Sequence, residues 1–187
     1  PLVHLPVQSG SNKILKLMNR NHSIENYLET FNKLKEINSK IEFSSDFIIA
    51  YPGEENQDFE DTLNLIKKVK FINSYSYIFS PRPGTVSENL NLIDKKTSFE
   101  RLEIIQNELF ENQIQKNKSL ENSIVEVLVE NLTEDKTKTF GRSKHMTSVI
   151  FDGKKSDIGK IVQVKISKSN RSTLFGEIVD NSNQKVA

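Results

Sequence analysis

The chain has no cysteine, no tryptophan and only two methionines among its 187 residues. Without cysteine it forms no disulfide and holds no cysteine-ligated zinc or iron–sulfur site of its own. The absence of disulfides is typical of the cytoplasm, where we expect this protein to work. Long hydrophobic runs are missing too, since no apolar stretch approaches the roughly 18 residues of a membrane helix. The sequence therefore excludes a disulfide-stapled domain and a membrane-spanning helix.

A large net charge is also absent, but the charges are unevenly distributed. The chain carries 26 basic and 25 acidic residues, for a formal net charge of +1. Residues 136–171 contain ten lysines and arginines and only two acids, Asp152 and Asp157. Residues 1–118 are nearly neutral, with fifteen basic and sixteen acidic residues. A nucleic-acid partner is thus suggested by the local basic segment and not by the total charge.

In the first part of the chain, short apolar strands alternate with amphipathic helices. The hydrophobic spacing predicts strands at residues 2–7, 43–51 and 75–79. It predicts helices at 12–19, after a cap at Ser23, and from Asn56 or Asp58. A longer helix is expected from Thr97, with Glu100 completing a capping box, to about Lys118. Strands separated by helices are typical of an α/β parallel sheet.

Each expected strand ends in a polar loop that contains glycine or proline. The loops read QSGS (8–11), YPGE (51–54) and SPRPGT (80–85). Ligands of parallel α/β sheets bind at the carboxyl ends of the strands, so these loops predict a ligand-binding rim. The alternative is that glycine and proline mark ordinary turns.

In the last part of the chain, the spacing of hydrophobic residues changes from that of helices to that of short strands. Five short strands are expected at 124–130, 138–142, 147–151, 161–167 and 173–179. So many short strands in one segment predict a small closed β-barrel. The domain boundary is expected near residues 118–121, which gives domains 1–118 and 119–187. Because the chain starts with Pro1 inside an expected strand, we expect it to be part of a longer protein.

Several ordered motifs carry a family resemblance that covers essentially the whole chain. They are HLPVQSGS (4–11), ILKLMNRNHS (14–23), SSDFIIAYPGEENQDFEDTL (44–63), YSYIFSPRPGT (75–85) and TLFGEIV (173–179). Together they resemble the radical S-adenosylmethionine (SAM) tRNA methylthiotransferases. The resemblance implies the carboxy-terminal part of such an enzyme: the last half of a TIM-like partial parallel barrel, then an OB-like TRAM domain.

Within this family, the branch that modifies isopentenyl-adenosine is the most similar. The QSGS segment and Arg82 differ from the branch that modifies a ribosomal protein. The branch acting on threonylcarbamoyl-adenosine shares QSGS and PGT and stays open, but SSDFI and YSYIFSPRPGT favour the isopentenyl branch. A non-catalytic RNA-binding module is a further alternative.

The resemblance implies a transferase that methylthiolates C2 of isopentenyl-adenosine beside the anticodon of tRNA. In that family SAM is both the methyl donor and the radical source, and two 4Fe-4S clusters take part. The cluster cysteines of the family lie upstream, so we expect no metal ligand and no catalytic residue in this chain. Expected partners are the tRNA anticodon stem-loop and the missing amino-terminal part of the same protein.

By the same resemblance, seven residues are expected to bind the SAM cofactor: Gln8, Ser9, Asp46, Ile48, Ala50, Phe79 and Arg82. Gln8 and Ser9 could instead stabilise the turn, and Arg82 could be a surface charge. Asp46, if buried, requires a polar partner. Because side chains alternate between the two faces of a strand, Ile48 and Ala50 are expected on the same face as Asp46. The family usually has glycine at position 50, where it lets the backbone approach the cofactor closely.

The basic segment supplies the candidates for RNA contact: Arg142, Lys144, Lys165, Lys168 and Arg171. Phosphate groups attract such side chains, and the attraction weakens as salt rises. A solvated basic surface is the alternative. His4, in an expected strand, has no visible partner ligands and is expected to be a packed or hydrogen-bonded residue. His22 and His145 are likewise unsupported as metal sites.

Overall fold

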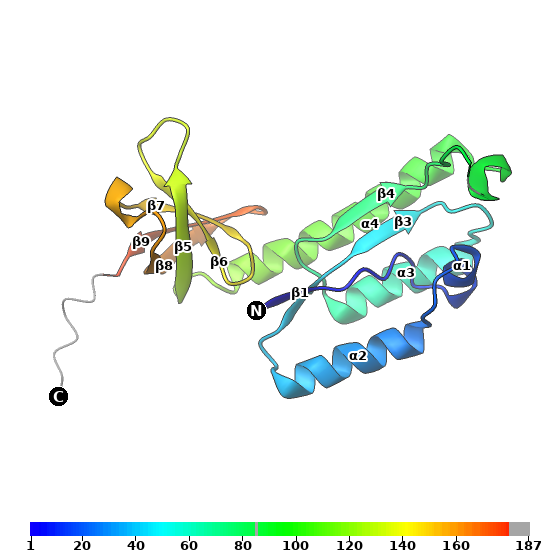
Figure 1. Ribbon diagram of the computed structural model, residues 1–187, viewed down its shortest axis with the longest axis horizontal. Coiled ribbons are helices and arrows are strands. Elements are labelled where there is room, and N and C mark those ends of the chain that lie inside the picture. The colour runs from blue at the N-terminus through cyan, green and yellow to red at the C-terminus, as the bar shows by residue number, and fades with distance from the viewer. Residues whose placement is uncertain (85, 180–187) are drawn as a thin grey trace. The chain divides into compact units, whose positions relative to one another are not determined.

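The structure is a computed structural model that describes residues 1–84 and 86–179 (Figure 1). The chain divides into two compact units. The α/β unit is Val3–Asn112, and the barrel unit contains Pro1–Leu2 and the residues from Gln113 onward. Thr85, the last residue of the expected SPRPGT loop, lies outside the described residues. Among the residues described, no helix is long and apolar enough to cross a membrane.

The α/β unit is built from short strands and longer helices. Its strands are β1 (Leu2–His4), β2 (Glu42–Ser44), β3 (Asp46–Ile49) and β4 (Tyr75–Ile78). Its helices are α1 (Asn12–Leu17), α2 (Ile24–Ile37), α3 (Asn56–Val69), the 3-10 turn η1 (Val86–Asn89) and the first part of α4 (Lys95–Lys118). Strands β3 and β4 pair in parallel, with Asp46 opposite Tyr75 and Ile49 opposite Ile78.

Side-chain hydrogen bonds explain where these elements begin and end. Ser23 caps α2 as predicted, because its side chain accepts from Asn26 N. The cap predicted at Thr97 is wrong: α4 begins at Lys95, and Asp94 accepts from Thr97 N at 2.9 Å. The strand expected at 43–51 is interrupted at Ser45, whose N–H donates to Ser74 Oγ and not to a strand neighbour.

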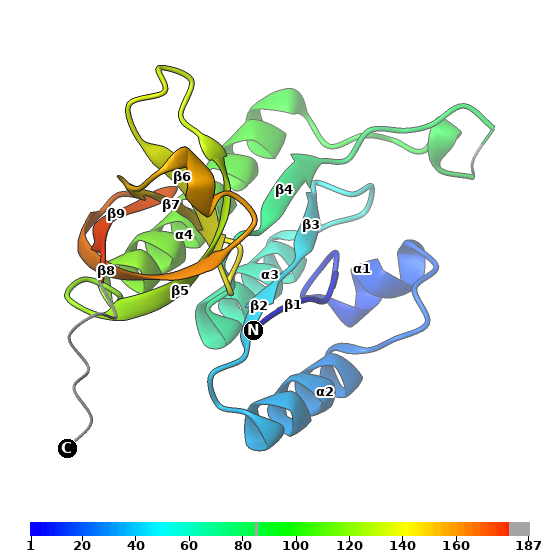
Figure 2. The same ribbon diagram turned by 60° about the vertical axis from the view of Figure 1, so that its left-hand side comes forward.

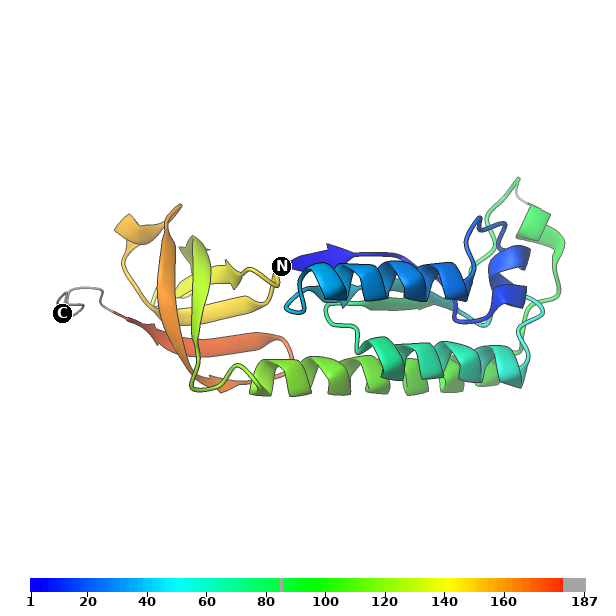
Figure 3. The ribbon, with the colours of Figure 1, turned by 90° about the horizontal axis from the view of Figure 1, so that it is seen from below.

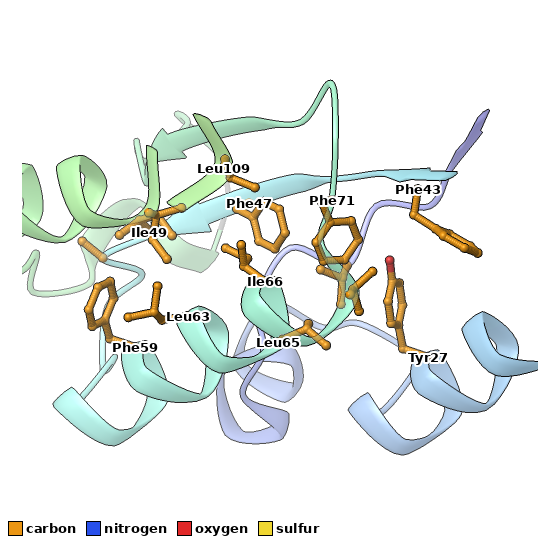
Figure 4. Close-up of a cluster of buried hydrophobic side chains, with 14 of the residues drawn as sticks. Tyr27, Phe43, Phe47, Ile49, Phe59, Leu63, Leu65, Ile66, Phe71 and Leu109 are labelled. Atoms are coloured by element: carbon orange, nitrogen blue, oxygen red, sulfur yellow. The ribbon is translucent and has the colours of Figure 1, made fainter. Parts of the chain in front are cut away.

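One face of the strands is buried under helices and forms the core of the α/β unit (Figure 4). Phe43, Phe47 and Phe71 are at most 1% exposed there. The rings of Phe47 and Phe71 meet edge to face, with centroids 5.3 Å apart. The other face of β4 is open, and its Tyr75 and Tyr77 side chains are 60% and 56% exposed.

The barrel unit contains five strands in a closed barrel (Figure 2). They are β5 (Ile124–Leu132), β6 (Thr139–Ser143), β7 (Ser148–Asp152), β8 (Ile161–Ser169) and β9 (Thr173–Ile178), with the 3-10 turn η2 (Lys155–Asp157). The order β5-β6-β7-β9-β8 closes by antiparallel pairing of β8 with β5, and only β7 and β9 run parallel. This confirms the expected small closed barrel.

The interior of the barrel is filled by alternate residues of its strands. They are Val127, Val129, Val149, Phe151, Val164, Ile166 and Leu174. The last turn of α4, a long helix in Figure 3, also contributes to this unit. Its fully buried Asn117 donates to the carbonyl oxygens of Asn170 and Arg171 at 2.8 and 3.0 Å. These bonds fix the turn between β8 and β9.

Gly176 allows β9 to approach β8 closely. A Cβ at this position would lie 2.2 Å from the carbonyl oxygen of Lys165, on the paired strand. We predict that Gly176→Ala lowers the free energy of unfolding by about 1–3 kcal/mol, because a backbone strand has to move. Denaturant unfolding of the purified chain measures the change. Glu177→Ala is the matched control, and an equal loss in both variants would contradict the packing argument.

Candidate functional site

The carboxyl ends of the three strand segments meet at one edge of the α/β unit. Gln8 donates its backbone N–H to Asp46 O at 3.0 Å and accepts from Ile48 N at 2.9 Å. Phe79 N donates to Ile49 O at 2.8 Å. We call this edge the strand-tip rim and define it as residues 8–11, 50–54 and 79–82. The expected ligand-facing loops are therefore neighbours in space.

Two residues of the rim other than glycine adopt the left-handed backbone conformation. Gln8 has φ +71° and Ala50 has φ +57°, and both are almost fully buried. Because β3 ends at Ile49, the alternation expected for Asp46, Ile48 and Ala50 stops at Ile48. The expectation that Ala50 shares their face by period two is therefore wrong. A glycine at position 50, as in the resembling family, would adopt this φ without strain.

Asp46 lies half-buried on the open face of β3, together with Ile48. Its Oδ2 is 3.4 Å from His4 Nε2, and the other ring nitrogen of His4 lies 2.8 Å from Ser44 Oγ. Asp46 thus has the polar partner that its position requires. His4 is a hydrogen-bonded residue, as expected.

Ser9 is fully buried within the first turn of the rim. Its hydroxyl lies 3.3 Å from Thr62 Oγ1 and accepts from Ser11 N at 3.2 Å. Ser11 and Lys13 donate to Asp58 of α3 at 2.6 and 2.9 Å. Burial alone would raise the pKa of Asp58, but the hydrogen bonds from Ser11 and Lys13 hold it below its ordinary value. The turn is therefore anchored to α3 through several polar contacts.

Phe79 and Arg82 follow β4 at the third tip. The half-buried Phe79 ring meets Tyr51 edge-on, with centroids 4.7 Å apart, and Arg82 is exposed in the loop that follows. Tyr51 also donates to Leu17 O at 3.1 Å. Beside these residues lies an open hollow of about 630 Å³, which the sequence did not predict. Its lining is Leu17, Met18, Asn19, Tyr51, Pro52, Gly53, Ser87, Leu90 and Asn91.

A buried ion pair supports the second tip and was also missed by the sequence reasoning. Arg101 of α4 donates to Glu54 Oε1 at 2.8 Å, to Glu54 O at 3.1 Å and to Asn56 Oδ1 at 2.7 Å. Glu54 in turn accepts from Ala50 N at 3.2 Å. Burial raises the pKa of Glu54, and the Arg101 guanidinium opposes that rise. The left-handed turn at Ala50 is thus held by a helix far along the chain.

Four of the five RNA-contact candidates gather at one end of the barrel. Arg142 lies opposite Ser148, which lies opposite Thr173, so the turns that carry Lys144 and Arg171 are neighbours. Lys168 lies close by on β8, opposite Phe175. We call Arg142, Lys144, Lys168 and Arg171 the basic end. Lys165 stands apart, opposite Glu177 further along the strands.

Within the described part of the chain, no three histidine, aspartate or glutamate side chains are grouped so as to hold a metal ion. The rim offers apolar, amide, hydroxyl and guanidinium groups, and its one carboxylate, Glu54, is buried against Arg101. Such groups can bind an organic ligand through hydrogen bonds and apolar contact.

Comparison with known families and proteins assigns both parts of the chain. Residues 1–66 match the radical SAM superfamily, and residues 118–179 match the TRAM domain. The chain is 66% identical over 187 residues to the tRNA-2-methylthio-N(6)-dimethylallyladenosine synthase of Pelagibacter ubique. The matched region covers all of this chain and 42% of that protein. Proteins of the same name match from Rickettsia akari (45% identity; 96% of this chain, 41% of the relative) and Ruthia magnifica (41% identity; 95% and 40%).

The chain thus spans about two fifths of the length of the curated relatives it matches. The similarity runs through both the rim and the barrel, since nearly the whole chain is covered in each comparison.

We predict that Arg101→Met lowers the free energy of unfolding of the α/β unit by about 3–5 kcal/mol, because it leaves the Glu54 carboxylate buried without its partner. The double variant Glu54→Gln with Arg101→Met removes the unpaired charge and recovers part of the loss. Denaturant unfolding followed by circular dichroism measures both. A double variant that is no more stable than Arg101→Met would contradict the ion-pair explanation.

Proposed function

We propose that this chain supplies part of the SAM pocket and the RNA-binding domain of a tRNA-modifying enzyme. The chain belongs to the radical SAM tRNA methylthiotransferase family. The proposed enzyme methylthiolates C2 of isopentenyl-adenosine beside the anticodon of tRNA. One observation carries the proposal: the first two tips of the rim lie in a segment that matches the radical SAM superfamily, and the closed barrel of the same chain lies in a segment that matches the TRAM domain. In such an enzyme the chain would work in the cytoplasm together with the rest of the same protein.

In this proposal residues 1–118 are the last part of a TIM-like partial parallel barrel, and residues 119–187 are the TRAM domain. The parallel pairing of β3 with β4 supports the first assignment. So does the burial of only one strand face, because the open face with Tyr75 and Tyr77 would then line the barrel interior. The strand order of the closed barrel resembles that of an OB-fold, which supports the second.

The rim residues fit one side of a SAM site. Ile48 and Phe79 offer apolar surface to the adenine ring, and Gln8 and Ala50 form the left-handed turns of the first and second tips beside them. The Gln8 amide can bind ribose or the amino-acid portion of SAM, and the Arg82 guanidinium suits a carboxylate. Asp46 supplies a polar group on the open face, and Ser9 shapes the turn through its hydroxyl. When bound, SAM would supply the methyl group and the radical.

The two 4Fe-4S clusters of the proposed enzyme need ligands from outside this chain, because it contains no cysteine. No residue of this chain is therefore assigned a catalytic role. What these residues do is bind and orient SAM and hold the substrate RNA. The anticodon stem-loop is the proposed partner of Arg142, Lys144, Lys165, Lys168 and Arg171.

The relatives favour this proposal over the alternatives. They are named for dimethylallyladenosine, which is isopentenyl-adenosine, and not for threonylcarbamoyl-adenosine or a ribosomal protein. The radical SAM match over residues 1–66 is not expected of a non-catalytic RNA-binding module.

We predict that deletion of the gene removes 2-methylthio-isopentenyladenosine from tRNA and leaves isopentenyl-adenosine in its place. Mass analysis of tRNA nucleosides from the deletion strain and from the complemented strain measures this. Loss of a methylthiolated threonylcarbamoyl-adenosine, or an unchanged nucleoside profile, would overturn the proposed substrate.

We also predict that the 187-residue chain binds an anticodon stem-loop weakly at low salt. The triple variant Arg142→Ala, Lys144→Ala and Arg171→Ala removes three phosphate contacts. We expect its slope of log affinity against log salt to be shallower by about two. Fluorescence anisotropy at several salt concentrations gives the slope. A triple variant at Lys40, Lys67 and Lys68 of the α/β unit is the control for net charge. Affinity that does not change with salt would contradict this role.

A further inference from the structure

A row of apolar side chains crosses the outside of the barrel. Phe140 of β6 lies opposite Ile150 of β7, and Ile150 lies opposite Phe175 of β9. Their chain neighbours point into the core, as the burial of Val149, Phe151 and Leu174 shows, so the row faces outward. All three side chains are half-buried. We call Phe140, Ile150 and Phe175 the outer row.

Two cations of the basic end lie against the aromatic rings of this row. The Arg142 guanidinium is 5.6 Å from the centroid of the Phe140 ring. Lys168 Nζ is 5.1 Å from the centroid of the Phe175 ring. The outer row is therefore directly next to the phosphate-attracting side chains of the same barrel.

A shallow hollow of about 780 Å³ opens beside the row. Ile150, Phe175, Ser167 and Lys168 form one part of its lining, and the loop between β5 and β6 forms another. The loop residues are Thr133, Glu134, Asp135, Thr137 and Lys138, and the rest of the lining is Asp152, Gly176 and Glu177. Carboxylates outnumber cations in this hollow, so a phosphate group is repelled from it.

We propose that the outer row is a stacking platform for an unpaired nucleobase of the bound RNA, with the adjoining phosphates at the basic end. This rests on the proposed RNA-binding function and adds which part of the RNA the barrel takes. A flat base matches the apolar surface of Phe175 and Ile150, because base–aromatic stacking tolerates any base. A base also carries amino groups that can donate hydrogen bonds to the carboxylates of the hollow, whereas a phosphate has no such donor.

The arrangement favours a single-stranded segment over a duplex. The bases of a duplex are stacked on each other and cannot reach a side-chain platform, whereas loop bases can. An acidic protein partner would suit the basic end but not the carboxylates of the hollow. The platform therefore makes the barrel bind loop RNA in preference to duplex RNA of equal charge.

The test uses the full chain with two labelled RNAs of equal length: a hairpin with an unpaired loop and a blunt duplex. Because the chain has no tryptophan, Phe175→Trp introduces the only one and keeps an aromatic face. We expect the hairpin to quench its fluorescence and the duplex to leave it nearly unchanged. Ile158→Trp, at the end of η2, is the control and should not be quenched by either RNA.

Phe175→Leu keeps an apolar side chain but removes the ring. We expect Phe175→Leu to lower hairpin affinity about tenfold, as for one lost base stack, and to leave duplex affinity unchanged. Phe175→Trp should bind the hairpin about as tightly as the unsubstituted chain. Thermal melting by circular dichroism verifies that each variant is folded.

The outcomes separate the platform from RNA binding itself. If the hairpin binds Phe175→Leu as tightly as the unsubstituted chain, or binds Phe175→Trp without quenching, the platform is overturned and salt-dependent RNA binding stands. If neither RNA binds at any salt, the RNA-binding function fails as well. Self-association that Phe175→Leu abolishes, without quenching by RNA, would identify the row as a protein contact and also overturn the platform.

Discussion

Two hydrogen bonds at Gln8, one donated to Asp46 O and one accepted from Ile48 N, hold the first strand tip against the second. A third, from Phe79 N to Ile49 O, adds the third tip. The candidate cofactor site depends on these backbone bonds, because its side chains come from segments separated by whole helices. Parallel pairing places carboxyl ends at one edge, so the rim follows from the pairing and not from any single residue.

The rim also needs support from outside itself. Ala50 and Gln8 have positive φ values, which cost energy for residues with a Cβ. Glu54 accepts from the N–H of Ala50 and from Arg101 of α4, and both charged residues are buried. Ser9, Ser11 and Asp58 fix the first turn to α3 in a similar way. The polar network thus keeps the backbone of the rim in a conformation that the sequence alone would not favour.

The barrel separates its interior from its outside by simple alternation along each strand. Inward valines and Phe151 make it a closed, independent core, and Gly176 lets β9 approach β8. The outward residues are then free to serve binding. The basic end and the outer row lie next to each other because β6, β7 and β9 are neighbours in the barrel, although they are not all consecutive in the chain. This closeness is what connects phosphate attraction with base stacking in the proposed RNA site.

The sequence by itself determined the α/β part, the small closed barrel, the Ser23 cap and the family motifs, because these depend on local period and local turn chemistry. It placed the α4 cap at Thr97 instead of Asp94 and extended the strand alternation to Ala50, because capping and the end of a strand depend on competing hydrogen bonds. Only the tertiary structure decided the Glu54–Arg101 pair, the pairing of His4 with Asp46, and the outer row beside Arg142 and Lys168. These contacts join residues far apart in the chain, and they depend on how helix α4 packs and on which strands pair, neither of which the local sequence pattern specifies.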